Sequence, residues 1–140
     1  MALRSIAKLR WLLPAMGLLV AVAFISRRHI GGPGSGSAIL EPAEAAAHLG
    51  RDATVCGKIV EATFVEGIDG RPTFLNFGGR HPDQVFTAVI WERHRHHFAT
   101  PPDELFDGES ACVTGRVREH RGVPQIEVSD PGAIRLGQPP

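Results

Sequence analysis

Histidine and arginine alternate in residues 93–97, RHRHH, the densest group of potentially reactive side chains in this 140-residue chain. Imidazole nitrogens are common metal ligands, and their charge changes near pH values of about 6.5. His94, His96 and His97 could therefore bind a metal ion or form a pH-sensitive patch. Adjacent side chains diverge on a strand or loop, and no cysteine or carboxylate lies at a matched spacing, so we expect no metal site.

The rest of the sequence shows no recognisable catalytic constellation. Common mechanisms need paired acids, a nucleophile beside its base, a phosphate-binding loop or a metal triad, and none occurs at a suitable spacing. The acids of PPDELFDG, Asp103, Glu104 and Asp107, suit the start of a helix, where carboxylates cap backbone N–H groups. We predict that the chain is not an enzyme and uses no cofactor.

Residues 72–91, PTFLNFGGRHPDQVFTAVIW, indicate a β-hairpin with aromatic side chains. Two apolar runs flank a polar connection that contains glycine and proline, which is typical of a hairpin with a long loop. Successive side chains of a strand point to opposite faces, so Phe74 and Asn76 share one face. Leu75 and Phe77 share the other. Either Phe74 lies on an open face, or it fills the core while Leu75 and Phe77 lie beneath a loop.

The second strand of this hairpin allows a similar arrangement. The polar Thr87 favours an outward orientation for Thr87, Val89 and Trp91, which exposes the Trp91 ring. Exposed aromatic rings stack on bases of single-stranded nucleic acid, at about 1–3 kcal/mol per base, while nearby cations bind the phosphates.

Cations that could bind phosphates lie in three groups. The groups are Arg80 with His81, residues 93–97, and Arg116 with Arg118 and Arg121. They either line one side of the fold or are ordinary solvated charges interleaved with Glu92 and Glu119.

The formal net charge of zero conceals an asymmetry along the chain. Residues 1–40 hold five of the 15 Lys and Arg residues and none of the 15 acids, so residues 41–140 carry 15 − 5 = 10 cations and a net charge of −5. This balance counts against strong non-specific binding of nucleic acid, which depends on clustered cations and counterion release.

The composition of the N-terminal 30 residues is not typical of a globular domain. Three basic residues precede an uncharged apolar run at residues 11–26, and Arg27 and Arg28 follow it. This pattern predicts an N-terminal hydrophobic helix that is either a signal peptide, cleaved near residues 21–23, or a retained membrane anchor. The alternative is a buried helix of a cytosolic protein.

The domain limits follow from composition. Residues 31–38, GGPGSGSA, are typical of a flexible linker, so we place a linker at 31–40 and the folded domain at 41–137. With the preceding segment retained, the domain is anchored to the inner membrane and lies in the periplasm or outside the cell. With the segment cleaved, it is secreted.

Two segments, VCGKIVEA (55–62) and VTGRVREH (113–120), share a pattern in which glycine lies on the inward face in the middle of a strand. Such a glycine marks a bend, a bulge or a barrel corner. The expected elements are a short helix at residues 42–48, strands at 54–66, 73–77 and 86–91, a helical turn at 102–106, and strands at 111–120 and 125–129, the last two joined by a tight turn at Arg121 and Gly122.

These segments together resemble the OB-fold nucleic-acid-binding domains of the tRNA-anticodon-binding type. They most resemble the versions found beside bacterial extracellular nucleases and as small stand-alone exported proteins, over about residues 43–136. The resemblance implies an all-β fold, a five-stranded Greek-key barrel with a short helix between strands three and four. It also implies that the domain binds single-stranded DNA or RNA.

In the related domains an aromatic residue at the position of Phe74 contacts a base, so the resemblance implies stacking on Phe74 and base reading by Asn76. The complete set of predicted nucleic-acid contacts is Phe74, Asn76, Arg80, Thr87, Trp91, Arg93, Arg116 and Arg118. The alternative is an exported OB scaffold that binds a protein or a carbohydrate, because a fold does not fix its ligand. The net charge favours this alternative.

The cysteine pairing also rests on the resemblance. In an OB barrel strands one and four pair antiparallel, which can place Cys56 opposite Cys112 at a distance that suits a disulfide. An exported domain can form such a bond. The alternative is two buried thiols that pack as small apolar side chains.

Overall fold

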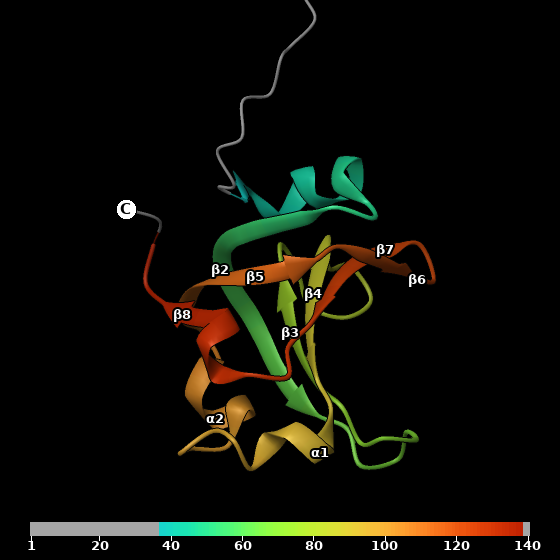
Figure 1. The fold of residues 1–140 in the computed structure, drawn as a ribbon. Helices are drawn as coiled ribbons and strands as arrows, with labels where there is room; N and C mark the ends of the chain where they lie inside the picture. The colour runs from blue at the N-terminus through green and yellow to red at the C-terminus, as the bar shows by residue number, and fades with distance from the viewer. Residues whose placement is uncertain (1–36, 139–140) are drawn as a thin grey trace, which may run out of the picture. The chain divides into compact units, whose positions relative to one another are not determined.

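A computed structural model describes residues 37–138, and it shows a mostly β fold with few and short helices, as predicted (Figure 1). The strands are β1 (Ala38–Leu40), β2 (Asp52–Phe64), β3 (Thr73–Phe77), β4 (Phe86–Ile90), β5 (Ser110–Arg116), β6 (Arg118–His120), β7 (Val123–Glu127) and β8 (Ile134–Leu136). The helices are η1 (Pro42–His48), α1 (Glu92–Arg95), α2 (Pro102–Phe106) and η2 (Pro131–Ala133).

The predicted hydrophobic helix of residues 1–30 lies outside the described residues. Between residues 37 and 138, no helix has the length and apolar character needed to cross a bilayer.

The strands pair in the order β6-β7-β4-β3-β2-β5-β8, and β1 pairs with β2. β4 and β7 are parallel, and the other neighbours along this order are antiparallel. β6 and β5 lie near opposite ends of the order, yet only Val117 separates them in the chain. One run of chain therefore pairs with β2 through its first part and with β7 through its last part.

The inward faces of these strands form one hydrophobic core. The largest fully buried side chains of this core are Phe77, Phe86, Ile59, Leu75, Ile90, Ile126, Val55, Val113, Val117 and Val128. The rings of Phe77 and Phe86, on opposite strands of the hairpin, meet edge to face with centroids 5.3 Å apart. In Figure 1, η1 lies at one end of the sheet, and α1 and α2 lie at the other.

The two mid-strand glycines lie on the inward face, as predicted, because side chains approach them closely. A Cβ atom on Gly57 would lie 2.7 Å from Pro42 of η1, and one on Gly115 would lie 2.7 Å from Ile126 of β7. The bulge in β2 falls instead between Ile59 and Glu61.

Several predicted elements have the observed bounds. The helix at 42–48, the strand at 73–77 and the helical turn at 102–106 are confirmed. The tight turn is also confirmed, since Arg121 and Gly122 both have positive φ, 49° and 81°. Residues 38–40, at the end of the predicted linker, form β1, which pairs with the start of β2.

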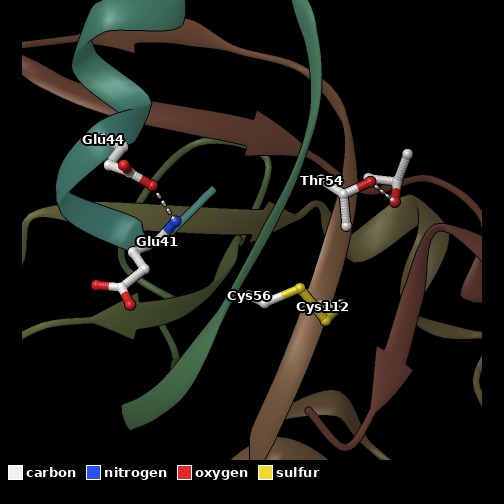
Figure 2. Close-up of a disulfide and its surroundings, with 6 residues drawn as sticks. Glu41, Glu44, Thr54, Cys56 and Cys112 are labelled. Atoms are coloured by element: carbon white, nitrogen blue, oxygen red, sulfur yellow. Dashed lines mark hydrogen bonds between the residues drawn. A yellow bond between two sulfur atoms is a disulfide. The ribbon is translucent and has the colours of Figure 1, made fainter. Parts of the chain in front are cut away.

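A disulfide joins Cys56 of β2 to Cys112 of β5, which face each other directly in the antiparallel register (Figure 2). Both side chains are buried, with 7% and 5% of their surface exposed. Two residues from each cysteine along its strand, Thr54 and Thr114 also face each other, and their hydroxyls form a hydrogen bond of 2.8 Å. The covalent link therefore lies on the outer side of the β2–β5 seam.

Candidate nucleic-acid interface

The strand register defines two rows of side chains on the outer face of the sheet, because residues directly opposite each other on paired strands share a face. The first row, from β6 to β2, is Arg118, Gln125, Thr87, Asn76 and Glu61. The second row, from β7 to β2, is Glu127, Val89, Phe74 and Thr63.

Phe74 and Trp91, the two predicted stacking rings, are half-buried. Phe74 lies on the outer face and takes no part in the core, where Leu75 and Phe77 are fully buried. Trp91 follows β4, and one side of its indole lies against Gly70, where a Cβ atom would come within 2.9 Å of the ring. The loop between β2 and β3 therefore fixes the orientation of Trp91.

Thr87 faces outward as predicted, and Asn76 lies on the same outer face, but neither side chain is exposed. Only 3% of the Asn76 surface and 5% of the Thr87 surface is exposed to solvent. The Thr87 hydroxyl donates to Asn76 Oδ1 at 3.1 Å, and Asn76 Nδ2 donates to Glu61 Oε2 at 3.0 Å. Both ends of the Asn76 amide and the Thr87 hydroxyl are thus engaged inside the protein in this conformation. The base-reading role of Asn76 and the contact by Thr87 stay predictions.

Glu61 is the centre of this network. Its Oε2 also accepts the backbone N–H of His81 at 3.0 Å, and its Oε1 lies 3.5 Å from Arg80 Nη1. These contacts tie the β3–β4 loop to β2. The His81 N–H, the Asn76 amide and the Arg80 charge hold the pKa of the Glu61 carboxyl below its ordinary value, and burial opposes them only in part.

A groove of about 290 Å³ opens on the outer side at the β6 end of the sheet. Its lining residues are Trp91, Arg93, His94, Arg116, Arg118, Glu127, Val128 and Ser129. These residues come from α1 and its N-terminal flank, from β5 and β6, and from β7 and the segment after it. The arrangement combines one aromatic ring, three arginines and a single carboxylate.

The three arginines of the groove are exposed and available for an anion. Arg93, Arg116 and Arg118 form no salt bridge with any residue between 37 and 138. Arg93 donates from Nε to His94 Nε2 at 3.0 Å, and its guanidinium lies 6.0 Å from the centre of the Trp91 ring.

His94 is neutral in this arrangement, since its Nε2 accepts a hydrogen bond. Burial is the first cause that lowers the pKa of His94, followed by the charge of Arg93. The neighbouring imidazoles of His97 and His96 lower it further, while Glu127 raises it. Its Nδ1 is shielded from solvent and has no partner within the described part of the chain.

The other members of the RHRHH segment have different positions. Arg95 is largely buried, its guanidinium lies 3.9 Å from the centre of the Phe64 ring, and it forms a 2.8 Å ion pair with Asp103. His97 Nδ1 lies 2.8 Å from the Ser129 carbonyl oxygen. Over residues 37–138 no three His, Cys, Asp or Glu side chains converge in a way that could hold a metal ion.

The structure thus brings together four of the predicted contacts: Trp91, Arg93, Arg116 and Arg118 line the groove. Phe74 and Arg80 lie outside its lining. The sequence reasoning missed His94 and Glu127 as groove residues, and Glu61 as the residue that holds the hairpin loop. Glu61 falls in the VCGKIVEA segment, but only the bulge in β2 places it opposite Asn76.

The chain matches no protein-family profile and no curated protein sequence. Among solved structures it is similar to asparaginyl-tRNA synthetase from Pyrococcus horikoshii (18% identity, TM-score 0.47), over 71% of this chain and 23% of the synthetase. It is also similar to aspartyl tRNA synthetase from Entamoeba histolytica (14% identity, TM-score 0.46), over 76% of this chain and 23% of that one.

A third similar structure is a lipoprotein of Klebsiella pneumoniae whose name describes it as nucleic acid-binding (18% identity, TM-score 0.41). This likeness covers 69% of the present chain and 79% of the lipoprotein. The present chain spans about a quarter of the two synthetases. Since these TM-scores lie below 0.5, the likenesses assign neither a family nor a ligand.

Proposed function

We propose that residues 37–138 form a closed OB-type barrel that binds single-stranded DNA or RNA without catalysing a reaction. Support for closure comes from the strand order, in which the run formed by β5, Val117 and β6 pairs with β2 at one end and β7 at the other. The parallel pairing of β4 with β7 and the helix α2 between β4 and β5 also suit this barrel type.

The observation that supports nucleic acid as the ligand is the groove beside Trp91. A base stacks on an aromatic face while arginine guanidinium groups neutralise the adjacent phosphates, so a ring and cations in one groove form the required combination. Three arginines against one carboxylate, Glu127, make the groove positive although residues 41–140 are acidic. The ligand is held by stacking and by charge, which suits single strands more than base-paired duplexes.

The domain acts outside the cytoplasm in this proposal. Support comes from the uncharged run at residues 11–26 with its basic flanks, and from the Cys56–Cys112 disulfide, a bond that persists in oxidising compartments. A retained N-terminal segment anchors the protein to the inner membrane, and a cleaved one releases it.

The test is a fluorescence-anisotropy titration of the full chain with labelled single-stranded oligonucleotides, at low and at physiological salt. Arg116→Ala/Arg118→Ala is expected to weaken binding at least tenfold, because each lost guanidinium removes a phosphate contact. The matched control is Lys58→Ala/Arg135→Ala, which removes the same charge from exposed sites outside the groove. Both double variants retain the cations of residues 1–40, so any attraction of nucleic acid by these cations is the same in the variant and in its control.

Equal losses in the groove variant and in the control would contradict the groove assignment and point to general charge attraction. Failure of the wild-type chain to bind any oligonucleotide at low salt would contradict the proposed function. Binding of an oligosaccharide or a protein in its place would then favour an OB scaffold with a different ligand.

Stacking on Trp91 is tested by Trp91→Leu, which keeps apolar volume against Gly70 but removes the aromatic face. The expected loss of binding free energy is about 1–3 kcal/mol, the range for one stacked base. Circular dichroism of the variant checks that the fold is intact. Unchanged affinity would remove Trp91 from the interface and leave the arginine assignment standing.

A further inference from the structure

The first row of the outer face has opposite charges at its two ends. It begins with the cation Arg118 on β6, which forms no salt bridge within residues 37–138, passes through three neutral residues, and ends with the carboxylate Glu61 on β2. The groove lies at the cationic end. A strand of nucleic acid that continued from the groove across β4 and β3 would bring its phosphates toward Glu61.

Glu61 is held as an anion close to the surface. Two N–H donors, from His81 and Asn76, lie 3.0 Å from its Oε2, and 23% of its side chain is exposed. Charges at this depth act over about 8 Å at physiological ionic strength. A phosphate over the hairpin therefore meets a fixed negative charge.

Glu61 also neutralises the cation that a hairpin-bound strand would need. Arg80 is the arginine of the β3–β4 loop, and its side chain is 71% exposed, yet its guanidinium lies 3.5 Å from Glu61. A phosphate that binds Arg80 must either break this pair or lie beside the carboxylate. The pair thus offers little counterion release, in contrast to the groove arginines, which have no salt-bridge partner among the described residues.

We infer that Glu61 is a positioning residue that confines a bound single strand to the half of the outer face formed by β4, β7 and β6. It does so by holding Arg80 and the hairpin loop out of the interface. The inference rests on the proposed function, and it departs from the sequence expectation that Phe74, Asn76 and Arg80 contact the ligand. The bound segment is accordingly short, with its phosphates at Arg93, Arg116 and Arg118.

The experiment measures oligonucleotide affinity of the full chain across a series of salt concentrations. Arg80→Ala is expected to change affinity less than twofold and to leave the log–log salt slope unchanged. Glu61→Gln keeps the shape of the side chain and one acceptor oxygen but frees Arg80. It is expected to increase affinity at least threefold and to steepen the slope by about 0.7, the value for one added phosphate contact on a single strand.

The double variant Glu61→Gln/Arg80→Ala controls for indirect effects of the loop, and it is expected to return the slope to the wild-type value. A loss of affinity in Arg80→Ala as large as that in Arg118→Ala would overturn the inference. So would a folded Glu61→Gln variant whose slope equals that of the wild type. If Glu61→Gln fails to fold, the Arg80→Ala result decides alone.

These outcomes are separable from failure of the proposed function. A chain that binds through the hairpin still binds in its wild-type form and fails only in the variant comparison. A chain that does not bind nucleic acid shows no titration with the wild type or with Glu61→Gln.

Discussion

The Glu61 carboxylate stabilises the folded state only while it is ionised, because its hydrogen bonds come from N–H donors. Its pKa in the fold is lower than the ordinary value of 4.5, mainly through the His81 N–H and then the Asn76 amide. The unfolded chain therefore binds the proton more readily than the fold does. The stabilisation is complete above pH 4.5 and is lost as the pH falls through the lower, folded pKa.

Thermal unfolding of wild type and Glu61→Gln tests this sign. We expect the wild type to have the higher Tm at pH 7, and the difference to shrink progressively as the pH drops below 4.5. Glu66→Gln is a suitable control, since Glu66 is an exposed acid on the neighbouring loop. A difference that is constant with pH would show that the network does not depend on the carboxylate charge.

His94 links ligand binding in the groove to pH, in the opposite direction to the effect of Glu61 on stability. Burial and the Arg93 charge lower its pKa, so it is neutral at pH 7 and gains a proton only below its ordinary value of 6.5. A phosphate bound in the groove favours the charged imidazole, which links ligand binding to proton uptake. We expect oligonucleotide affinity to rise as the pH falls below 6.5.

His94→Gln is expected to reduce this rise, and a titration series between about pH 5 and 8 measures it. Arg93, His96, His97 and Glu127 act on His94 electrostatically and are unchanged in the variant. The comparison therefore isolates His94. An identical pH profile in wild type and variant would mean that the neighbouring groups alone set the response.

At this scale the sequence predicted which side chains of a strand share a face, but it left open which face of β3 is the outer one. It placed Thr87 on the outer face, and in the structure Asn76 lies opposite Thr87 on that face. Their burial depends on Glu61 and on the hairpin loop, which reaches back to β2 through His81. Such contacts between distant segments leave no periodic signal in a single sequence.

Among the elements, β2 and β5 are held together by the disulfide as well as by backbone pairing. The bond closes a loop with a sequence separation of 56 residues between Cys56 and Cys112. Chain-entropy reasoning gives about 4 kcal/mol of stabilisation for a loop of this length. The bond acts mainly by restricting the unfolded chain.

Urea unfolding of Cys56→Ser/Cys112→Ser is expected to show a loss of about 4 kcal/mol in the free energy of unfolding, within the usual range of 2–5. The matched control is Thr54→Val/Thr114→Val, which removes a hydrogen bond across the same seam and should cost about 1 kcal/mol. Equal losses in the two double variants would argue against a significant covalent contribution.

Element prediction worked where the signal extends over several residues. The strand at 73–77 and the helices at 42–48 and 102–106 have clear apolar patterns or proline starts. β1, β8 and α1 have three or four residues each, so no periodicity can develop in them. β1 is positioned by its pairing with β2, β8 by its pairing with β5, and α1 by the direction of the chain after β4.

At the scale of the whole domain, residues 37–138 present a small positive groove on an acidic surround. Three arginines and a slope of about 0.7 per phosphate predict a log–log salt dependence of about −2 for single-stranded oligonucleotides. The net charge of −5 on residues 41–140 keeps non-specific attraction weak. A measured slope much steeper than −2 would show that cations outside the groove, such as those in residues 1–40, dominate binding.

The mostly β character of the fold was predictable because strand patterns with one intervening helix follow one another along the sequence. The closure of these strands into a five-stranded barrel stays a prediction. The groove was only partly predictable. Its arginines form separate groups in the sequence, and the parallel pairing of β4 with β7 and the pairing of β7 with β6 bring them to one side of the fold.

The disulfide also determines how the folded chain transmits a pulling force. When the chain is pulled from its two ends, tension passes directly from Cys56 to Cys112 through the covalent bond. Residues 57–111, which include Trp91 and α1, lie within the loop that the disulfide closes. They therefore carry no tension, even after the segments before Cys56 and after Cys112 have unfolded. Reduction of the bond would release this segment and lengthen the stretched chain by roughly 200 Å.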